Sequence, residues 1–158
     1  GGGGIFAVNL AVESGSTVHV TGAWTDDRSG AGGALWVLRN LQVRAGSTLH
    51  LTDSFAGLGG GFFQGSNGIG IILGWIAGID SGSGTVLDDN ASVVISNTRA
   101  GVEGGGFVVE CPLLVTGNST LSLSGTVADG HEGGFHAHES VTLMQGSKIL
   151  LANVSAYS

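Results

Sequence analysis

Apolar and polar residues alternate in short runs along this chain, and the same pair of runs recurs around a small polar turn. The segment from Val12 to Val20 (Val-Glu-Ser-Gly-Ser-Thr-Val-His-Val) aligns without a gap with the segment from Val43 to Leu51. Three further copies occupy residues 87–95, 115–123 and 143–151. Alternation with a period of two on both sides of a turn predicts two short β-strands in each copy.

A Gly-Gly pair followed by apolar residues lies between successive copies and predicts a third strand in each unit. The spacing between the pairs is 29, 28, 45 and 28 residues, and they are Gly3-Gly4, Gly32-Gly33, Gly60-Gly61, Gly105-Gly106 and Gly133-Gly134. A period near 28 indicates a stacked array, because one such unit cannot bury its own apolar face. An antiparallel sandwich would also give short strands, but it has no reason to repeat the same turn in every unit.

We therefore predict an all-β fold, a single-stranded parallel β-helix (β-solenoid) of about five coils of 28 residues, with residues 1–158 forming one domain. The chain begins and ends within a repeat, so we expect it to be a segment of a longer protein. Alternation directs one set of side chains inward, and residues at equivalent positions should stack at a spacing of about 4.8 Å. The predicted interior column is Val18, Leu49, Val93, Leu121 and Ile149. We also predict a turn residue with positive φ at one equivalent position of every unit, which is occupied by Gly22, Asp53, Asn97, Gly125 and Asn153.

The third unit carries a surplus of about 17 residues, which predicts an inserted apolar, Gly-rich loop over residues 65–84. Insertions in solenoids form loops on one face, often the binding face. Two interpretations stay open: a flap folded over its own coil, or a contact patch for a protein partner, a larger assembly or a membrane surface. The candidate contact residues are Ile69, Ile71, Ile72, Leu73, Trp75, Ile76 and Ile79.

Composition narrows the partner classes. The net charge of −7 offers no basic patch, which argues against nucleic acid. The apolar run over residues 69–79 is broken by glycine and too short to span a bilayer as a helix. Cys111 is the only cysteine, so no disulfide can form within the chain, and we expect a small buried apolar side chain.

Two half-motifs resemble those of the chlamydial polymorphic membrane proteins. Gly32 to Leu35 (Gly-Gly-Ala-Leu) is similar to their GGA[ILV] motif. Val94-Ile-Ser-Asn97, followed by Ala100 and Gly104 to Gly106, is similar to their FxxN motif and its spacing, with Val94 in place of Phe. The resemblance implies an adhesin-like surface array on a right-handed parallel β-helix, and it implies no catalytic residues.

Three groups of residues invite a chemical role. His136 and His138 lie two apart and would share a face of a strand, as metal ligands can. We expect the aligned positions to hold Val108, Leu35 and Phe6, so no column of ligands builds up. The acidic pairs Asp26-Asp27 and Asp88-Asp89 fall in turn-like stretches, which favours solvated turn residues over the clustered carboxylates of a polysaccharide lyase or hydrolase. We predict no metal, no cofactor and no enzymatic activity.

Outward-facing residues of the strand after each turn should align into rows of hydroxyl groups. Such rows suit ice or glycan binding, but they also suit an ordinary solvent-exposed β-sheet surface. They are Thr17/Thr21, Thr48/Thr52, Ser92/Ser96 and Thr120/Ser124. Glycosylation sequons begin at Asn90, Asn118 and Asn153 and favour an extracellular or cell-surface location. The sequence thus predicts a non-catalytic structural or adhesive scaffold. A carbohydrate-active β-helix and an ice- or glycan-binding face are the alternatives.

Overall fold

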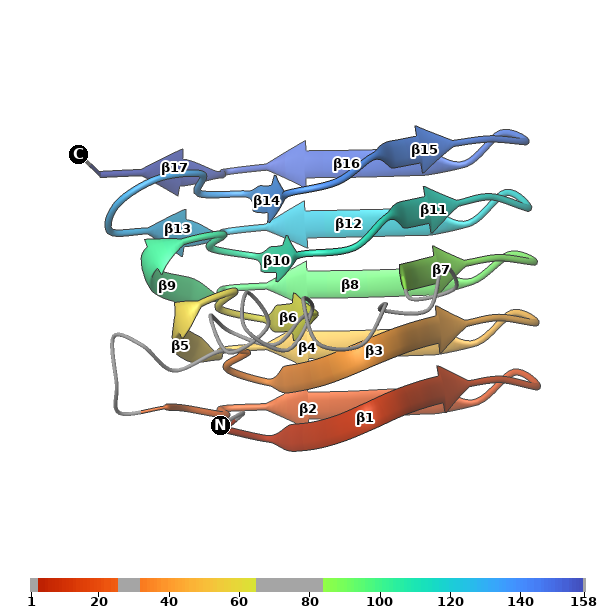
Figure 1. Ribbon diagram of the computed structural model, residues 1–158, viewed down its shortest axis with the longest axis horizontal. Coiled ribbons are helices and arrows are strands. Elements are labelled where there is room, and N and C mark those ends of the chain that lie inside the picture. The colour runs from red at the N-terminus through yellow and green to blue at the C-terminus, as the bar shows by residue number, and fades with distance from the viewer. Residues whose placement is uncertain (1–2, 26–31, 65–83, 158) are drawn as a thin grey trace, which may run out of the picture.

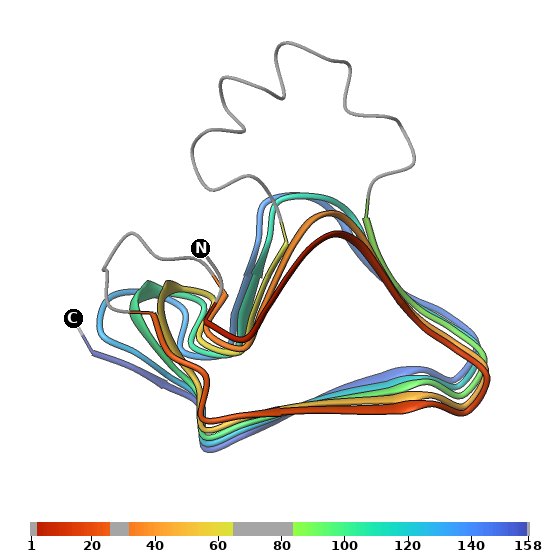
Figure 2. The same ribbon diagram turned by 90° about the horizontal axis from the view of Figure 1, so that it is seen from below.

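The computed structural model describes residues 3–25, 32–64 and 84–157, which wind into a stack of coils with three parallel β-sheets along its sides (Figure 1). The chain visits the sheets in the same order in each coil. Viewed along the stack, the coils lie over one another in a common outline (Figure 2).

Each sheet collects equivalent strands from successive coils, and every pairing between them is parallel. The first, eight-stranded sheet A contains β1 (Ile5–Val12), β3 (Leu35–Val43), β6 (Phe62–Gln64), β7 (Gly84–Leu87), β10 (Phe107–Val109), β11 (Leu113–Val115), β14 (Phe135–Ala137) and β15 (Val141–Leu143). Sheet B contains β2 (Thr17–Thr21), β4 (Thr48–Thr52), β8 (Ser92–Ser96), β12 (Thr120–Ser124) and β16 (Lys148–Ala152). Sheet C contains β5 (Phe55–Leu58), β9 (Arg99–Glu103), β13 (Val127–Ala128) and β17 (Ser155–Ala156).

This arrangement confirms the predicted parallel β-helix. Sheet B holds five strands, one from each passage of the chain, so four turns separate its first strand from its last. The coils are numbered 1 to 5 by these strands. No helix of the described residues is long and apolar enough to cross a membrane.

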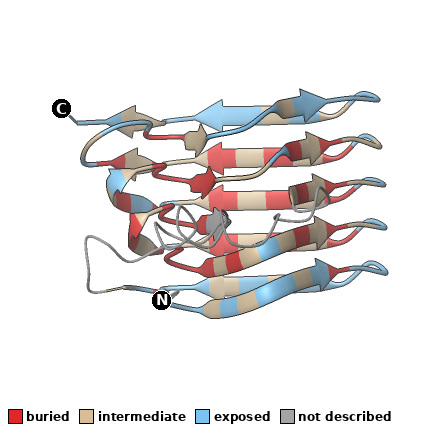
Figure 3. Cartoon of the chain, in the orientation of Figure 1, coloured by how far each residue is buried: buried red, intermediate tan, exposed pale blue. Residues whose placement is uncertain are grey.

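The predicted interior column is confirmed strand by strand. Val18 pairs with Leu49, and the column continues through Val93 and Leu121 to Ile149. A second interior column lies two residues further along each strand of sheet B. In this column Leu51 of coil 2 is fully buried, whereas Leu151 of coil 5 is 53% exposed. Burial is therefore greatest in the middle coils and is lower in the first and last coils, at the two ends of the stack (Figure 3).

Two left-handed residues form each turn between sheets A and B. Their φ values are positive at Ser14-Gly15, Ala45-Gly46, Asp89-Asn90, Gly117-Asn118 and Gln145-Gly146. Consecutive positive φ angles define a type I′ turn, which Gly and Asn adopt at least strain. The predicted positive-φ position after sheet B is confirmed too, with φ between 52° and 66° at Gly22, Asp53, Asn97, Gly125 and Asn153.

The corner between sheets C and A corrects the glycine alignment of the second unit. Ala34, not Gly33, stands opposite Gly61, because Leu35 pairs with Phe62. Gly32 consequently occupies the position before the pair, where φ is 59° and matches Gly59 and Gly104. The need for a left-handed residue sets this register, and the methyl group of Ala34 is accommodated in the core.

The insertion of the third unit falls between β6 and β7. Both strands pair with β3: Gln64 stands opposite Val37 and Gly84 opposite Asn40. Gly84, the last residue of the predicted 65–84 loop, belongs to β7. The seven apolar candidates for partner contact, Ile69 to Ile79, lie outside the described residues.

Candidate functional site

The outline of each coil is indented where the chain passes from sheet C back to sheet A (Figure 2). Side chains from the two sheets are in contact along this inward bend of the backbone, and we call this bend the groove. In the middle coils its contents are apolar: Val108 is 1% exposed and packs against Trp36 and Leu58. Phe6 extends the apolar lining toward coil 1, with its ring centroid 5.0 Å from that of Trp36.

Where the chain passes from coil 3 to coil 4, and again from coil 4 to coil 5, the contents of the groove change from apolar to charged. Glu103 at the end of β9, Glu132 before β14 and His136 within β14 bring their carboxylate oxygens and imidazole nitrogen within 4.8 Å of one another. The Nδ1 atom of His136 lies 3.3 Å from Glu132 Oε2 and 3.9 Å from Glu103 Oε2. Glu103 and His136 are about three-quarters buried as side chains, and Glu132 is more exposed.

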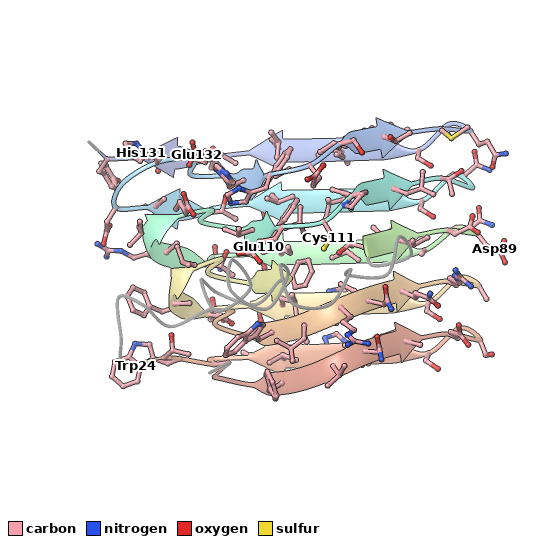
Figure 4. All side chains as sticks on the ribbon, viewed as in Figure 1. Trp24, Asp89, Glu110, Cys111, His131 and Glu132 are labelled. Atoms are coloured by element: carbon pink, nitrogen blue, oxygen red, sulfur yellow. The ribbon has the colours of Figure 1, made fainter. Side chains whose placement is uncertain are left out.

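The same groove positions hold apolar residues or glycine in other coils. Glu103 stands opposite Leu58, and His136 stands opposite Val108. Glu132 replaces the left-handed glycine and has a φ of 46°. The backbone there is strained for a residue with a Cβ, and such strain often accompanies a functional role. Figure 4 shows Glu132 and His131 at one side of the stack and Asp89, in coil 3, at the opposite side.

The alignment predicted for His136 was wrong at one position. The register places Trp36, not Leu35, opposite Phe6 and Phe63, and therefore in the row of His136. The reason is the same one-residue displacement that moves Ala34 opposite Gly61. His136 and His138 do lie together, with ring centroids 4.4 Å apart, but β14 ends at Ala137.

The acidic pair Asp88-Asp89 does not join His136 in a cluster. Asp88 and Asp89 lie in the sheet A–sheet B turn of coil 3, where the Asp89 amide donates a hydrogen bond of 2.7 Å to Asp88 Oδ1. Their role as turn residues is thereby explained by local geometry. Asp26-Asp27 lie outside the described residues.

The outward face of sheet B carries the predicted hydroxyl ladders in register. Thr17, Thr48, Ser92 and Thr120 follow one another, and Lys148 ends the row in coil 5. Thr21 Oγ1 and Thr52 Oγ1 share a hydrogen bond of 2.9 Å in the second row. Between the rows, the rings of His19 and His50 stack with centroids 4.3 Å apart. Partial burial, and then the neighbouring His19, lower the pKa of His50 below its ordinary value of 6.5.

The three sequon asparagines are exposed and lie in left-handed turn positions. Asn90 and Asn118 share the type I′ turn of successive coils, in register with Ser92 and Thr120. Asn153 occupies the turn between β16 and β17.

Sequence reasoning found His136 but missed Glu103 and Glu132. A signal was present: Glu132-Gly133-Gly134 stands where coil 4 has Gly104-Gly105-Gly106, so a glutamate replaces a glycine of the repeat. Comparisons with protein-family models, curated proteins and solved structures give no match. The candidate function therefore rests on the geometry of this chain alone.

Proposed function

We propose that this chain is a non-catalytic structural or adhesive scaffold, located outside the cytoplasm, in which the β-solenoid supports a protein-contacting segment at residues 65–83. Regular columns of buried Val, Leu and Ile stabilise the stack by burying apolar area at about 25 cal/mol per Å². Such an interior makes a stiff rod without specialised residues.

The observation that carries the proposal is the continuity of sheet A across the insertion. Coil 2 joins Val37 to Asn40 through only two residues, and coil 3 joins the paired positions Gln64 and Gly84 through residues 65–83. The strands on both sides of the insertion still pair with coil 4, as β6 with β10 and β7 with β11. Pairing among the described strands thus continues on both sides of the insertion, which supports a role of the insertion in contact rather than in folding.

Replacement of residues 65–83 by the two-residue Leu38-Arg39 link of coil 2 tests whether the β-solenoid folds without the insertion. We expect a β-rich circular dichroism spectrum and cooperative unfolding with a midpoint within a few degrees of the parent. An unfolded or aggregated variant would show that the insertion belongs to the core and would contradict its role as an added contact segment.

Site-specific photo-crosslinking in the cells that naturally produce this protein tests whether the segment contacts a protein partner. A photoreactive residue placed at Trp75 should give a discrete protein adduct, while the same residue at the exposed Asp89 serves as the matched control and should not. Equal products at both positions, or no product at Trp75, would contradict a contact role. A different assay tests the carbohydrate-active alternative. If the parent chain cleaves pectin or alginate by hydrolysis or elimination and Asp88→Asn abolishes that cleavage, the scaffold proposal is wrong and the carbohydrate-active one replaces it.

A second candidate, glycan or ice binding, is favoured by the in-register hydroxyl rows on sheet B. Two rows at strand spacing present a repeating set of donors and acceptors on one face. Thr48→Tyr would disturb one row at its middle, so it should abolish glycan retention or thermal hysteresis if this face binds. Thr142→Tyr, on the partly exposed face of sheet A, is the control.

A further inference from the structure

The charged cluster in the groove points to a ligand that the scaffold proposal does not require. We propose that Glu103, Glu132 and His136 form a binding site for a first-row divalent transition metal ion, with Zn²⁺ as the reference ion. The site lies between two successive passages of the chain from sheet C to sheet A. Glu103 ends β9 of coil 3, where the chain enters coil 4, and Glu132 and His136 lie where the chain passes from coil 4 to coil 5.

The distances within the cluster are close to those that a tetrahedral ion needs. With metal–ligand bonds of about 2.0–2.2 Å, two ligand atoms on a tetrahedral zinc ion stand about 3.3–3.5 Å apart. The separation between His136 Nδ1 and Glu132 Oε2 is already 3.3 Å, and that between His136 Nδ1 and Glu103 Oε2 is 3.9 Å. The third separation, between the carboxylate oxygens of Glu103 and Glu132, is at most 4.8 Å, so side-chain rotation would have to draw these two ligands together around the ion.

The donor set selects the class of metal. One imidazole nitrogen with two carboxylates suits zinc and its neighbours, whereas Ca²⁺ takes six to eight oxygen ligands and Mg²⁺ requires a near-octahedral oxygen shell. Three protein ligands leave a position for water, and the two carboxylates balance the charge of a divalent ion. A metal ion would also relieve the repulsion between Glu103, whose side chain is about three-quarters buried, and the more exposed Glu132.

The position of Glu132 departs from the repeat, because a glutamate stands where other coils have a left-handed glycine. Three other coils use glycine at this position, with φ values of 59°, 58° and 64° at Gly32, Gly59 and Gly104. Glutamate adopts a φ of 46° there and aims its carboxylate at His136. A glycine would satisfy the fold with less strain, so the side chain itself is the feature that the position adds.

Isothermal titration of the metal-stripped, untagged chain with ZnCl₂, together with visible absorption after adding Co²⁺, tests the site. We expect one ion per chain, a four-coordinate Co²⁺ spectrum, a higher unfolding midpoint with Zn²⁺, and no response to Mg²⁺ or Ca²⁺ at the same concentrations. Absence of one-to-one Zn²⁺ binding by the parent chain would overturn the proposal.

Three variants that borrow residues from neighbouring coils locate the site. Glu132→Gly restores the repeat glycine and His136→Val takes the residue of Val108, so both should fold. Because loss of an outer partner alone weakens metal binding by about 10–100-fold, loss of a ligand should weaken it at least that much. The control His50→Val takes the residue that coil 3 has at Val94; it removes an imidazole elsewhere and should leave binding unchanged. Unaltered binding in Glu132→Gly or His136→Val, or binding lost in His50→Val, would place the metal elsewhere and refute the site.

Discussion

The Oγ atom of Ser119 in coil 4 accepts a hydrogen bond of 3.1 Å from the amide of Ala91 in coil 3. The same contact recurs one coil on, where Ser147 Oγ accepts from the Ser119 amide at 3.2 Å. It recurs again between the Ser16 amide and Ser47 Oγ. Serine hydroxyls at the end of the type I′ turn therefore link successive turns, and Ser47 and Ser119 are fully buried.

Removal of one of these hydroxyls should weaken the stack. Ser119→Ala leaves the buried Ala91 amide without this acceptor, and an unpaired buried donor costs about 1–3 kcal/mol. We expect the free energy of unfolding, measured by urea denaturation, to fall by that amount. Ser122→Ala, on the outward face of the following strand, is the control and should change it by less than about 0.5 kcal/mol. Equal losses in both variants would show that the turn hydrogen bond has no special weight.

The sequence predicted the repeated turn and the interior columns because both depend on local pattern. Alternation sets which residues face inward, and the period brings Leu49 under Val93 whatever the shape of the coil. The groove cluster escaped prediction because Glu103 and His136 are 33 residues apart, which does not match the coil period. They meet because sheet C turns back toward sheet A, and no alternation of apolar residues encodes that indentation. The one-residue displacement at Ala34 escaped because a Gly-Gly-Ala run aligns equally well in two registers.

Thr85 is a polar member of an otherwise aliphatic column, and its replacement should stabilise the protein. It pairs with Leu41 and Leu113, is 2% exposed, and its Oγ1 has no hydrogen-bond partner among the described residues. Thr85→Val keeps the shape and removes the desolvated hydroxyl, so the free energy of unfolding should rise by about 1 kcal/mol. The measurement is the midpoint of urea denaturation at constant slope.

Thr98→Val provides the matched contrast. Thr98 is also buried, but its Oγ1 donates a hydrogen bond of 2.6 Å to the carbonyl of Gly105. The same substitution there should lower the free energy of unfolding by about 1 kcal/mol or more. Stability changes in the same direction for the two threonine variants would contradict this distinction between a paired and an unpaired buried hydroxyl.

Gly105 marks a close approach between coils and should tolerate no side chain. A Cβ atom there would stand against the carbonyl oxygen of Gly133 and 2.6 Å from that of Val127, both backbone atoms. Gly105→Ala should therefore destabilise the protein by about 1–3 kcal/mol or more, seen as a lower thermal midpoint. Gly101→Ala is the control, because its Cβ would meet nothing nearer than 3.8 Å and its φ is not left-handed. A comparable loss in both variants would contradict the contact between coils as the reason for glycine at position 105.

His50 should make the stability of the folded chain depend on pH between pH 5.5 and pH 7.5, where ordinary carboxylates are already ionised. Burial and then the stacked His19 lower the pKa of His50, so the unfolded chain binds its proton more readily than the folded chain. The stability contributed by neutral His50 is fully present above its ordinary pKa of 6.5 and is lost as the pH falls from there toward the folded pKa. The thermal midpoint should be lower at pH 5.5 than at pH 7.5, and His50→Val should reduce this difference. His131→Ser, which changes an exposed histidine outside the stacked pair, should preserve it; a pH dependence unchanged in His50→Val would assign it to other groups.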